Sequence, residues 1–212
     1  MLKLHHLNHS RSQRVLWLLE ELGLDYELIS YQRDSKTGLA PPELKSVHPL
    51  GKAPVLEDAG RVIAESGAII DYVVRRHGQG RLAPPPDSLE FDAYVEWLHY
   101  AEGSAMLPFM LGLYLSRLGE AAAPVMPRLG SEVSNHLGYL SSALGEHEYL
   151  VGDTFTAADI QISFVLEAAQ SSNALARYPN LGAYLQRMHT RPAYQRALTR
   201  GGPFDLSAMR KR

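Results

Sequence analysis

The chain contains no cysteine among its 212 residues. This absence excludes disulfides, thiolate metal sites, Cys-x-x-Cys redox chemistry and cysteine nucleophiles. Any thiol that reacts here must therefore be supplied by a ligand. Nine histidines are present, but none forms a His-x-x-x-His or HExxH pair on a segment expected to be helical, so we expect no bound metal.

Strong charge and long apolar runs are also missing. The net charge is −2, which gives no electrostatic attraction to nucleic acid or to anionic membranes. No apolar run approaches the roughly 18 residues that span a bilayer, and the N-terminus lacks the apolar core of a signal peptide. With 45% hydrophobic and 21% charged residues, the composition predicts a globular protein, which we expect in the cytoplasm without nucleic-acid or membrane partners.

The first 80 residues alternate between strand and helix patterns. Residues 2–7 and 26–30 are typical of strands, and the segment between them has a helical period with Gly23 as its stop; its apolar face consists of Val15, Leu18, Leu19 and Leu22. A polar loop follows at residues 33–49. Two short strands around the turn at residues 58–60 come next, and a second helix opens at Glu65-Ser66. The pattern is a βαβ unit followed by ββα.

Three consecutive prolines, Pro84, Pro85 and Pro86, mark the clearest boundary in the chain. Beyond them the strand signals vanish, and four stretches are typical of helices: residues 89–118, 124–144, 157–169 and 181–198. We therefore expect three parts: an α/β domain at residues 1–80, a Pro-rich linker at 81–88, and an all-α helical bundle at 89–212. The tail after Gly201 is expected to be loosely ordered.

Four motifs in this order resemble the soluble glutathione transferases, in particular serine-type, bacterial or fungal members. They are residues 8–15 (NHSRSQRV), residues 49–56 (PLGKAPVL), Glu65-Ser66, and residues 155–159 (FTAAD). The resemblance covers nearly the whole chain. It implies a thioredoxin-like N-terminal domain that binds glutathione and a helical C-terminal domain that binds an electrophile.

The resemblance assigns glutathione contacts to five residues. Ala53, before Pro54, would bind the cysteinyl part through its backbone groups, as a β-like addition. A helix N-terminus provides free amides and a positive dipole end for the γ-glutamyl carboxylate, so Ser66 would bind that group and Glu65 would pair with the ammonium. Lys52 could neutralise the glycyl carboxylate. Alone, an Ala-Pro turn or a Glu-Ser pair is equally typical of an ordinary turn or a helix cap.

The catalytic group is ambiguous by one residue. A hydrogen-bond donor to the glutathione sulfur stabilises the reactive thiolate. In serine-type relatives the hydroxyl lies six residues before the apolar residue that follows the helix arginine, and counting back from Val15 gives His9, with Ser10 one residue later. Ser10 is our first choice because its hydroxyl suits the role, His9 is the second, and a backbone amide is the remaining alternative. Ser12 is interpreted as a helix cap, and Arg14 as a brace of the fold.

An electrophile pocket is expected between the two domains, on the first long helix of the second domain. Its candidate residues are Tyr100, Glu102, Met106 and Phe109. The same spacing is equally typical of a plain helix-bundle core. Thr156 and Asp159 have the spacing of a capping box, which we assign to stability.

The predicted function is glutathione transfer to small hydrophobic electrophiles, typical of detoxification. The resemblance further implies a homodimer, formed through the helix after Glu65-Ser66 and the first helix of the second domain. Two alternatives remain open: a non-catalytic interaction or regulatory module of the same fold, and a glutathione-dependent peroxidase. A thioredoxin-like reductase is excluded by the missing cysteines.

Overall fold

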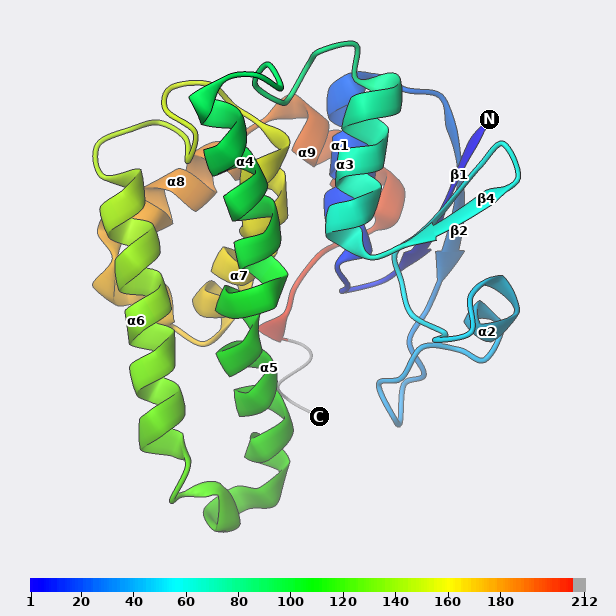
Figure 1. Ribbon diagram of the computed structural model, residues 1–212. Coiled ribbons are helices and arrows are strands. Elements are labelled where there is room, and N and C mark those ends of the chain that lie inside the picture. The colour runs from blue at the N-terminus through cyan, green and yellow to red at the C-terminus, as the bar shows by residue number, and fades with distance from the viewer. Residues whose placement is uncertain (208–212) are drawn as a thin grey trace. The chain divides into compact units, whose positions relative to one another are not determined.

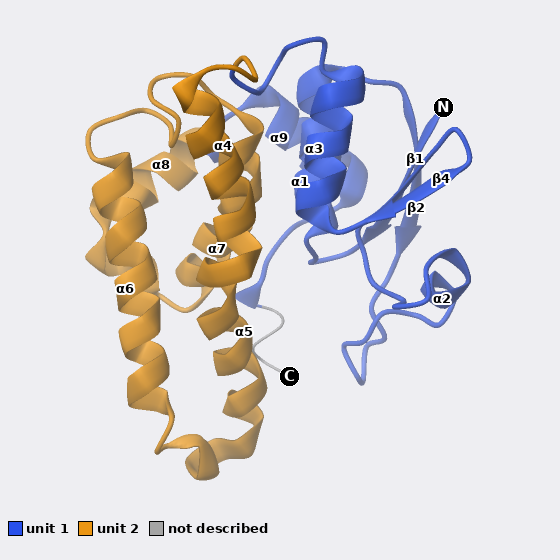
Figure 2. Ribbon diagram, in the orientation of Figure 1, with its two compact units in different colours: residues 1–84, 188–212 blue, residues 85–187 orange. Residues whose placement is uncertain are grey.

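The structure is a computed structural model that describes residues 1–207. The chain forms two compact units, which Figure 2 colours separately. Within the described residues, the first comprises 1–84 and 188–207, and the second comprises 85–187. The sequence placed everything from residue 89 to residue 212 in one helical part, whereas the last helix packs with the first unit. Residues 208–212 lie outside the described part of the chain.

The first unit is built on a four-stranded mixed sheet with the order β2-β1-β3-β4 (Figure 1). β1 (Leu2–Leu7) pairs in parallel with β2 (Tyr26–Tyr31) and antiparallel with β3 (Val55–Asp58). β4 (Arg61–Ala64) forms an antiparallel hairpin with β3. Because β1 and β2 run parallel, the chain between them must cross over, and α1 (Ser12–Leu22) is that crossover.

Helices α1 and α3 (Ser66–His77) pack against each other and onto the sheet. The apolar face predicted for α1 is fully buried, and Gly23 ends the helix with the left-handed φ of 62° that glycine adopts freely. The predicted loop at residues 33–49 contains one helical turn, α2 (Leu44–Val47), which is too short to give a periodic signal in the sequence.

Helix α9 (Pro192–Gly201) packs on α1 and completes the first unit. Two arginines of α9 hold Glu20 of α1: Arg196 Nε lies 2.9 Å and Arg200 Nη1 lies 3.0 Å from its carboxylate oxygens. Glu20 is only 9% exposed, and charge-assisted hydrogen bonds of this kind are the strong ones. These ion pairs and the edge-to-face contact of buried Tyr194 with Trp17 of α1 hold the last helix on the α/β unit.

The second unit is helical, and its central element is α7 (Ala157–Ser171), which is buried along nearly its whole length. Around it the chain forms the helices α4 (Leu89–Tyr100), α5 (Met106–Leu115), α6 (Met126–Leu144) and α8 (Pro179–His189), with the short elements η1 (Ala101–Ala105), η2 (Ser116–Ala122) and η3 (Ala174–Arg177). The long helix expected at residues 89–118 is thus interrupted at η1, a π-helical segment. Insertions of this type often accompany functional sites.

The capping box predicted at the start of α7 is confirmed. The Asp159 carboxylate accepts the backbone N–H and the hydroxyl of Thr156, the N–H of Leu150 and the hydroxyl of Tyr184. Among residues 1–207, no helix is both long and apolar enough to cross a membrane.

Candidate functional site

The register of the sheet brings three of the sequence motifs to one end of the first unit. Val55 pairs with Ala64 on one side and with His5 on the other. Because both pairings are antiparallel, the residues just before Val55, just after Ala64 and just after β1 all lie at the same end of the sheet. Residues 52–54, Glu65-Ser66 and the turn at residues 8–11 therefore converge, although they are distant in sequence.

Helix α3 begins with an open N-terminus at this end of the sheet. Its N-cap is Glu65, which is exposed and has φ 69° and ψ 117°, a conformation that side-chain-bearing residues rarely adopt. Within the described residues, no side chain caps the amides of the first turn. Free amides and the positive end of the helix dipole together form an anion-binding site.

Ser66 is the first residue of α3, 3% exposed, and its hydroxyl is held by a buried cation. The guanidinium Nη2 of Arg14 lies 2.7 Å from Ser66 Oγ. Because arginine can only donate, Ser66 Oγ is the acceptor, and the serine hydrogen can point to another acceptor. Arg14 is 1% exposed, so its positive charge lies beside the open helix end with little screening.

Arg14, which the sequence analysis interpreted as a brace of the fold, joins α1 to the start of α3 and brings a positive charge to the candidate site. An arginine directly before the apolar run at residues 15–19 is a signal that could have been followed. A buried charge requires a partner or an anionic ligand. The structure brings this one to the start of a different helix.

The Pro54 segment enters the sheet directly beside α3. The Ala53–Pro54 peptide bond is cis. Pro54 is buried and Ala53 is half-buried, and pairing of β3 begins only at Val55. The backbone groups of Ala53 therefore precede the hydrogen-bonded ladder. Lys52 is exposed at the same end.

The Ser10 hydroxyl is buried and engaged within its own turn. Ser10 is 5% exposed. Its Oγ accepts the backbone N–H of Ser12 at 3.2 Å and lies 2.8 Å from Ser12 Oγ. The N-cap of α1 is Arg11, which makes no side-chain cap, so the expected capping by Ser12 is replaced by this serine pair.

His9 lies in the same turn with a left-handed φ of 49° and is half-buried. Its Nδ1 accepts the backbone N–H of Asp205 at 3.1 Å. In the neutral imidazole one nitrogen accepts and the other donates, so this contact leaves the hydrogen on Nε2. Nε2 is therefore the donor nitrogen of His9, and both Ser10 and His9 stay candidates.

The predicted electrophile residues belong to the second unit and divide into two groups. Met106 and Phe109 are 4% and 8% exposed, which agrees with the helix-core alternative. Tyr100 and Glu102 are partly exposed, at and within the π-helical turn.

The Tyr100 hydroxyl lies 2.7 Å from His136 Nδ1. Burial and the neighbouring Tyr139 raise the pKa of Tyr100. This hydroxyl therefore stays neutral and can serve only as a hydrogen-bonding group at ordinary pH.

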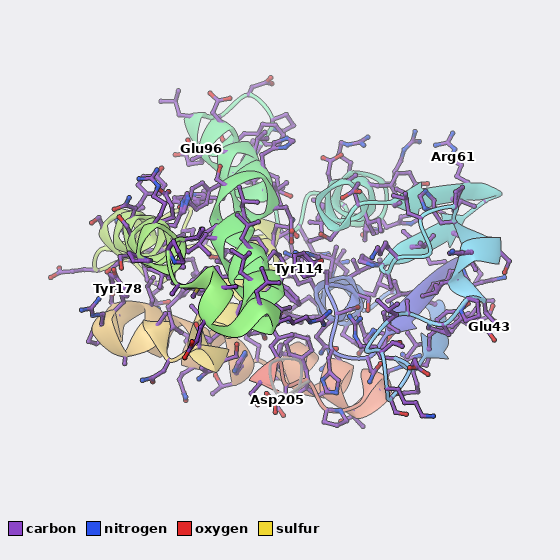
Figure 3. All side chains as sticks on the ribbon, turned by 90° about the horizontal axis from the view of Figure 1, so that it is seen from below. Glu43, Arg61, Glu96, Tyr114, Tyr178 and Asp205 are labelled. Carbon is purple, nitrogen blue, oxygen red and sulfur yellow. The ribbon has the colours of Figure 1, made fainter. Side chains whose placement is uncertain are left out.

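Apolar residues of α5 outside the four candidates are exposed instead. Leu107, Leu111 and Tyr114 recur at helical spacing and are 55%, 40% and 56% exposed (Figure 3 labels Tyr114). In residues 1–207, no group of three or more potential ligand residues could hold a metal ion.

Comparisons with known proteins agree with this architecture. Residues 1–75 match the family of the glutathione S-transferase N-terminal domain, and residues 121–197 match a glutathione S-transferase C-terminal domain family. The chain is 35% identical over 208 residues to glutathione S-transferase 3 of Schizosaccharomyces pombe, covering 91% of this chain and 85% of the relative.

Solved structures give the same result. A glutathione S-transferase crystal structure from Actinobacillus pleuropneumoniae has 37% identity and a TM-score of 0.90, and the alignment covers 98% of this chain and 96% of that one. A glutathione transferase family member from Pseudomonas fluorescens, solved with two glutathione molecules bound, has 26% identity and a TM-score of 0.79, with 93% and 92% of the two chains covered.

Proposed function

The chain belongs to the glutathione S-transferase family, and on this premise we propose that it adds the thiolate of glutathione to small hydrophobic electrophiles. The observation that carries the proposal is the open N-terminus of α3, where buried Arg14 holds Ser66. A carboxylate ligand would complete this arrangement. The protein has no cysteine, so the reacting thiol is the one that glutathione brings.

Glutathione binding is proposed to use both chain segments at this end of the sheet. The γ-glutamyl carboxylate accepts the hydroxyl hydrogen of Ser66 and amides of the first turn of α3, while the exposed Glu65 pairs with the ammonium. The backbone of Ala53, before Pro54, binds the cysteinyl part, and Lys52 approaches the glycyl carboxylate.

Thiol activation is proposed to come from Ser10, with His9 as the second candidate. A hydroxyl that donates to the sulfur stabilises the thiolate, and lowering the thiol pKa by two units takes about 2.7 kcal/mol. The Ser10 hydroxyl would turn from Ser12 to the sulfur when glutathione binds. The Ser12 N–H to Ser10 Oγ hydrogen bond leaves that rotation possible.

For the electrophile, Tyr100 and Glu102 are the partly exposed polar residues of the predicted pocket. The exposed side chains of Leu107, Leu111 and Tyr114 offer apolar surface on the adjoining helix. Aromatic and aliphatic surface with few polar groups suits varied hydrophobic substrates. Met106 and Phe109 would support this surface from beneath.

The expected homodimer, formed through α3 and α4, belongs to the same proposal and rests on the family. Sedimentation equilibrium tests it directly. A molar mass near 23.5 kDa at micromolar concentration would contradict the dimer without affecting the proposed chemistry.

The enzyme proposal is tested by calorimetric titration with glutathione, followed by turnover with an aryl halide. We expect saturable binding below millimolar glutathione and formation of the thioether. No binding at millimolar glutathione would overturn the proposal. Binding without turnover of any aryl halide or peroxide would favour the non-catalytic module, and turnover of a peroxide alone would favour the peroxidase.

A further inference from the structure

His6 is a buried histidine that none of the proposed roles uses. It lies on β1, is 2% exposed, and has both ring nitrogens in hydrogen-bond contact. Nε2 lies 3.1 Å from the carbonyl oxygen of Gly201, the last residue of α9. Nδ1 lies 2.9 Å from Ser12 Oγ. The imidazole thus connects the end of α9 with the turn that carries Ser10.

The Gly201 carbonyl determines which ring nitrogen of His6 carries the hydrogen. A carbonyl oxygen can only accept, so Nε2 must donate to it. Burial lowers the pKa of His6, which keeps the ring neutral. In a neutral ring with a hydrogen on Nε2, Nδ1 is an acceptor. The hydroxyl of Ser12 must therefore donate to His6.

The direction of the Ser12–His6 hydrogen bond also determines the direction of the hydrogen bond between Ser12 and Ser10. The Ser12 hydroxyl has one hydrogen, and His6 Nδ1 at 2.9 Å is nearer than the Leu7 carbonyl at 3.2 Å. Ser12 Oγ already accepts the Leu7 N–H at 3.1 Å. Toward Ser10 Oγ, at 2.8 Å, it can then only accept. The Ser10 hydroxyl is consequently the donor of the serine pair, and its position depends on Ser12 Oγ, which His6 holds.

The end of α9 packs so closely against His6 that it fixes the position of the imidazole. A Cβ on Gly201 would lie 3.0 Å from His6 Nε2 and 2.5 Å from a Leu16 methyl group. The ion pairs of Glu20 with Arg196 and Arg200 hold the last two turns of α9 on α1. The same C-terminal segment reaches the other candidate donor, through the Asp205 N–H to His9 (Figure 3 labels Asp205).

We propose that His6 is a positioning residue for thiol activation: held by the Gly201 carbonyl, it accepts a hydrogen bond from the Ser12 hydroxyl and so fixes Ser12 Oγ, which holds the Ser10 hydroxyl where it can turn to the glutathione sulfur. The proposal deepens the proposed function and rests on it. His6 does not touch the substrate in this scheme. No bond is made or broken at its ring.

Two substitutions distinguish the hydrogen bond of His6 Nδ1 from that of His6 Nε2. In His6→Asn the amide reaches about the position of Nδ1, so its oxygen can still accept from Ser12, while the contact to Gly201 is lost. In His6→Gln the amide reaches about the position of Nε2, so it can still donate to Gly201, while the contact to Ser12 is lost. The pair is matched in chemistry and in burial.

We expect His6→Gln to lower kcat by about tenfold and His6→Asn to stay within about threefold of the wild type, since a misplaced catalytic group costs up to about a hundredfold. Titration of the thiolate absorbance in the glutathione complex should show a higher thiol pKa for His6→Gln only. The glutathione Kd should stay unchanged in both variants. In a cycle with Ser12→Ala, the effect of His6→Gln should vanish, because both act through one hydrogen bond.

A purely structural role for His6 predicts another pattern. The two variants would then lose activity in proportion to their thermal stability, with the thiol pKa unchanged, and this result would overturn the proposal. Equal kcat values for His6→Asn and His6→Gln would also overturn it. If the wild type binds no glutathione, the proposed function falls and this inference with it; if the wild type turns over and the two variants behave alike, only the inference falls. Gly130→Ala, at a helical glycine with open space around it, controls for substitution as such.

Discussion

Helices α3 and α7 begin differently, although each starts with a hydroxyl residue and an acidic residue. At α7, Thr156 and Asp159 satisfy each other's amides in a closed capping box. At α3, Glu65 forms no cap, and Ser66 accepts from Arg14. The α7 terminus satisfies its own donors, whereas the α3 terminus leaves them to another partner.

The difference separates a stabilising helix start from a binding one. A closed box contributes to folding and has nothing left for a ligand. An open end costs stability, because its amides lack protein acceptors and Glu65 keeps a left-handed φ of 69°. Such a cost is typical of sites that a ligand completes. Four measurements test whether the two helix starts differ in this way.

The largest effect is expected on stability, at α7. Asp159→Ala removes the acceptor of buried donors from Leu150, Thr156 and Tyr184, and each unsatisfied group costs about 1–3 kcal/mol. We expect the free energy of unfolding to fall by about 4 kcal/mol in urea titrations, with the glutathione Kd unchanged in the folded protein. Asp159→Asn, which keeps one acceptor oxygen, should fall between this variant and the wild type. A weakened glutathione Kd in Asp159→Asn would contradict the separation.

The second measurement tests whether the N-terminus of α3 binds glutathione independently of the group that activates the glutathione thiol. Ser10→Ala should lower kcat with an aryl halide by about a hundredfold, as the loss of one donor to a developing anion does in other enzymes. The glutathione Kd, measured by calorimetry, should change little, because the anchor at α3 is intact. His9→Asn is the matched variant, because its amide can still accept the Asp205 N–H near the position of Nδ1 but has no donor at Nε2. If it produces the larger loss of kcat, the donor is His9 Nε2.

The third measurement addresses the anchor itself. Ser66→Ala removes one hydrogen bond to a charged carboxylate, which corresponds to about 1.5–3 kcal/mol, or at least a tenfold weaker glutathione Kd. Turnover at saturating glutathione should remain close to that of the wild type. Ser163→Ala, at a serine of α7 that is equally buried and donates to Ile160, is the control. A glutathione Kd in Ser66→Ala equal to that of the control would remove the anchoring argument.

Much of the fold could be predicted because the signals are local. Apolar periodicity located the four strands and the long helices, and the spacing of Thr156 and Asp159 predicted the box. The π-helical turn at η1 and the short α2 carry too few residues for a periodic signal. The placement of α9 depends on contacts with α1 between residues more than 170 positions apart, including the ion pairs of Glu20, so no local window of sequence contains it.

In the candidate site too, the local motifs could be predicted from the sequence and the long-range contacts could not. Glu65-Ser66 and Ala53-Pro54 are short motifs, and the strand register brings them together as the resemblance implied. Their proposed roles stay predictions. The contacts of Arg14 with Ser66 and of His6 with Gly201 join residues 52 and 195 positions apart. Neither residue type reveals its partner, because a buried arginine or histidine can be satisfied in many ways.

The smallest effect is expected at Glu65, where stability and binding should move in opposite directions. Glycine adopts positive φ without a Cβ penalty, and a left-handed non-glycine residue costs about 1–3 kcal/mol. Against this, glycine adds entropy to the unfolded chain, so Glu65→Gly should raise the free energy of unfolding by about 0.5–1 kcal/mol. The same change removes the carboxylate proposed to hold the ammonium, and the glutathione Kd should weaken several-fold. Glu65→Gln separates the two, since it keeps the backbone cost and removes only the charge. A Glu65→Gly variant that is more stable and binds glutathione as well as the wild type would show that the strained residue serves no ligand.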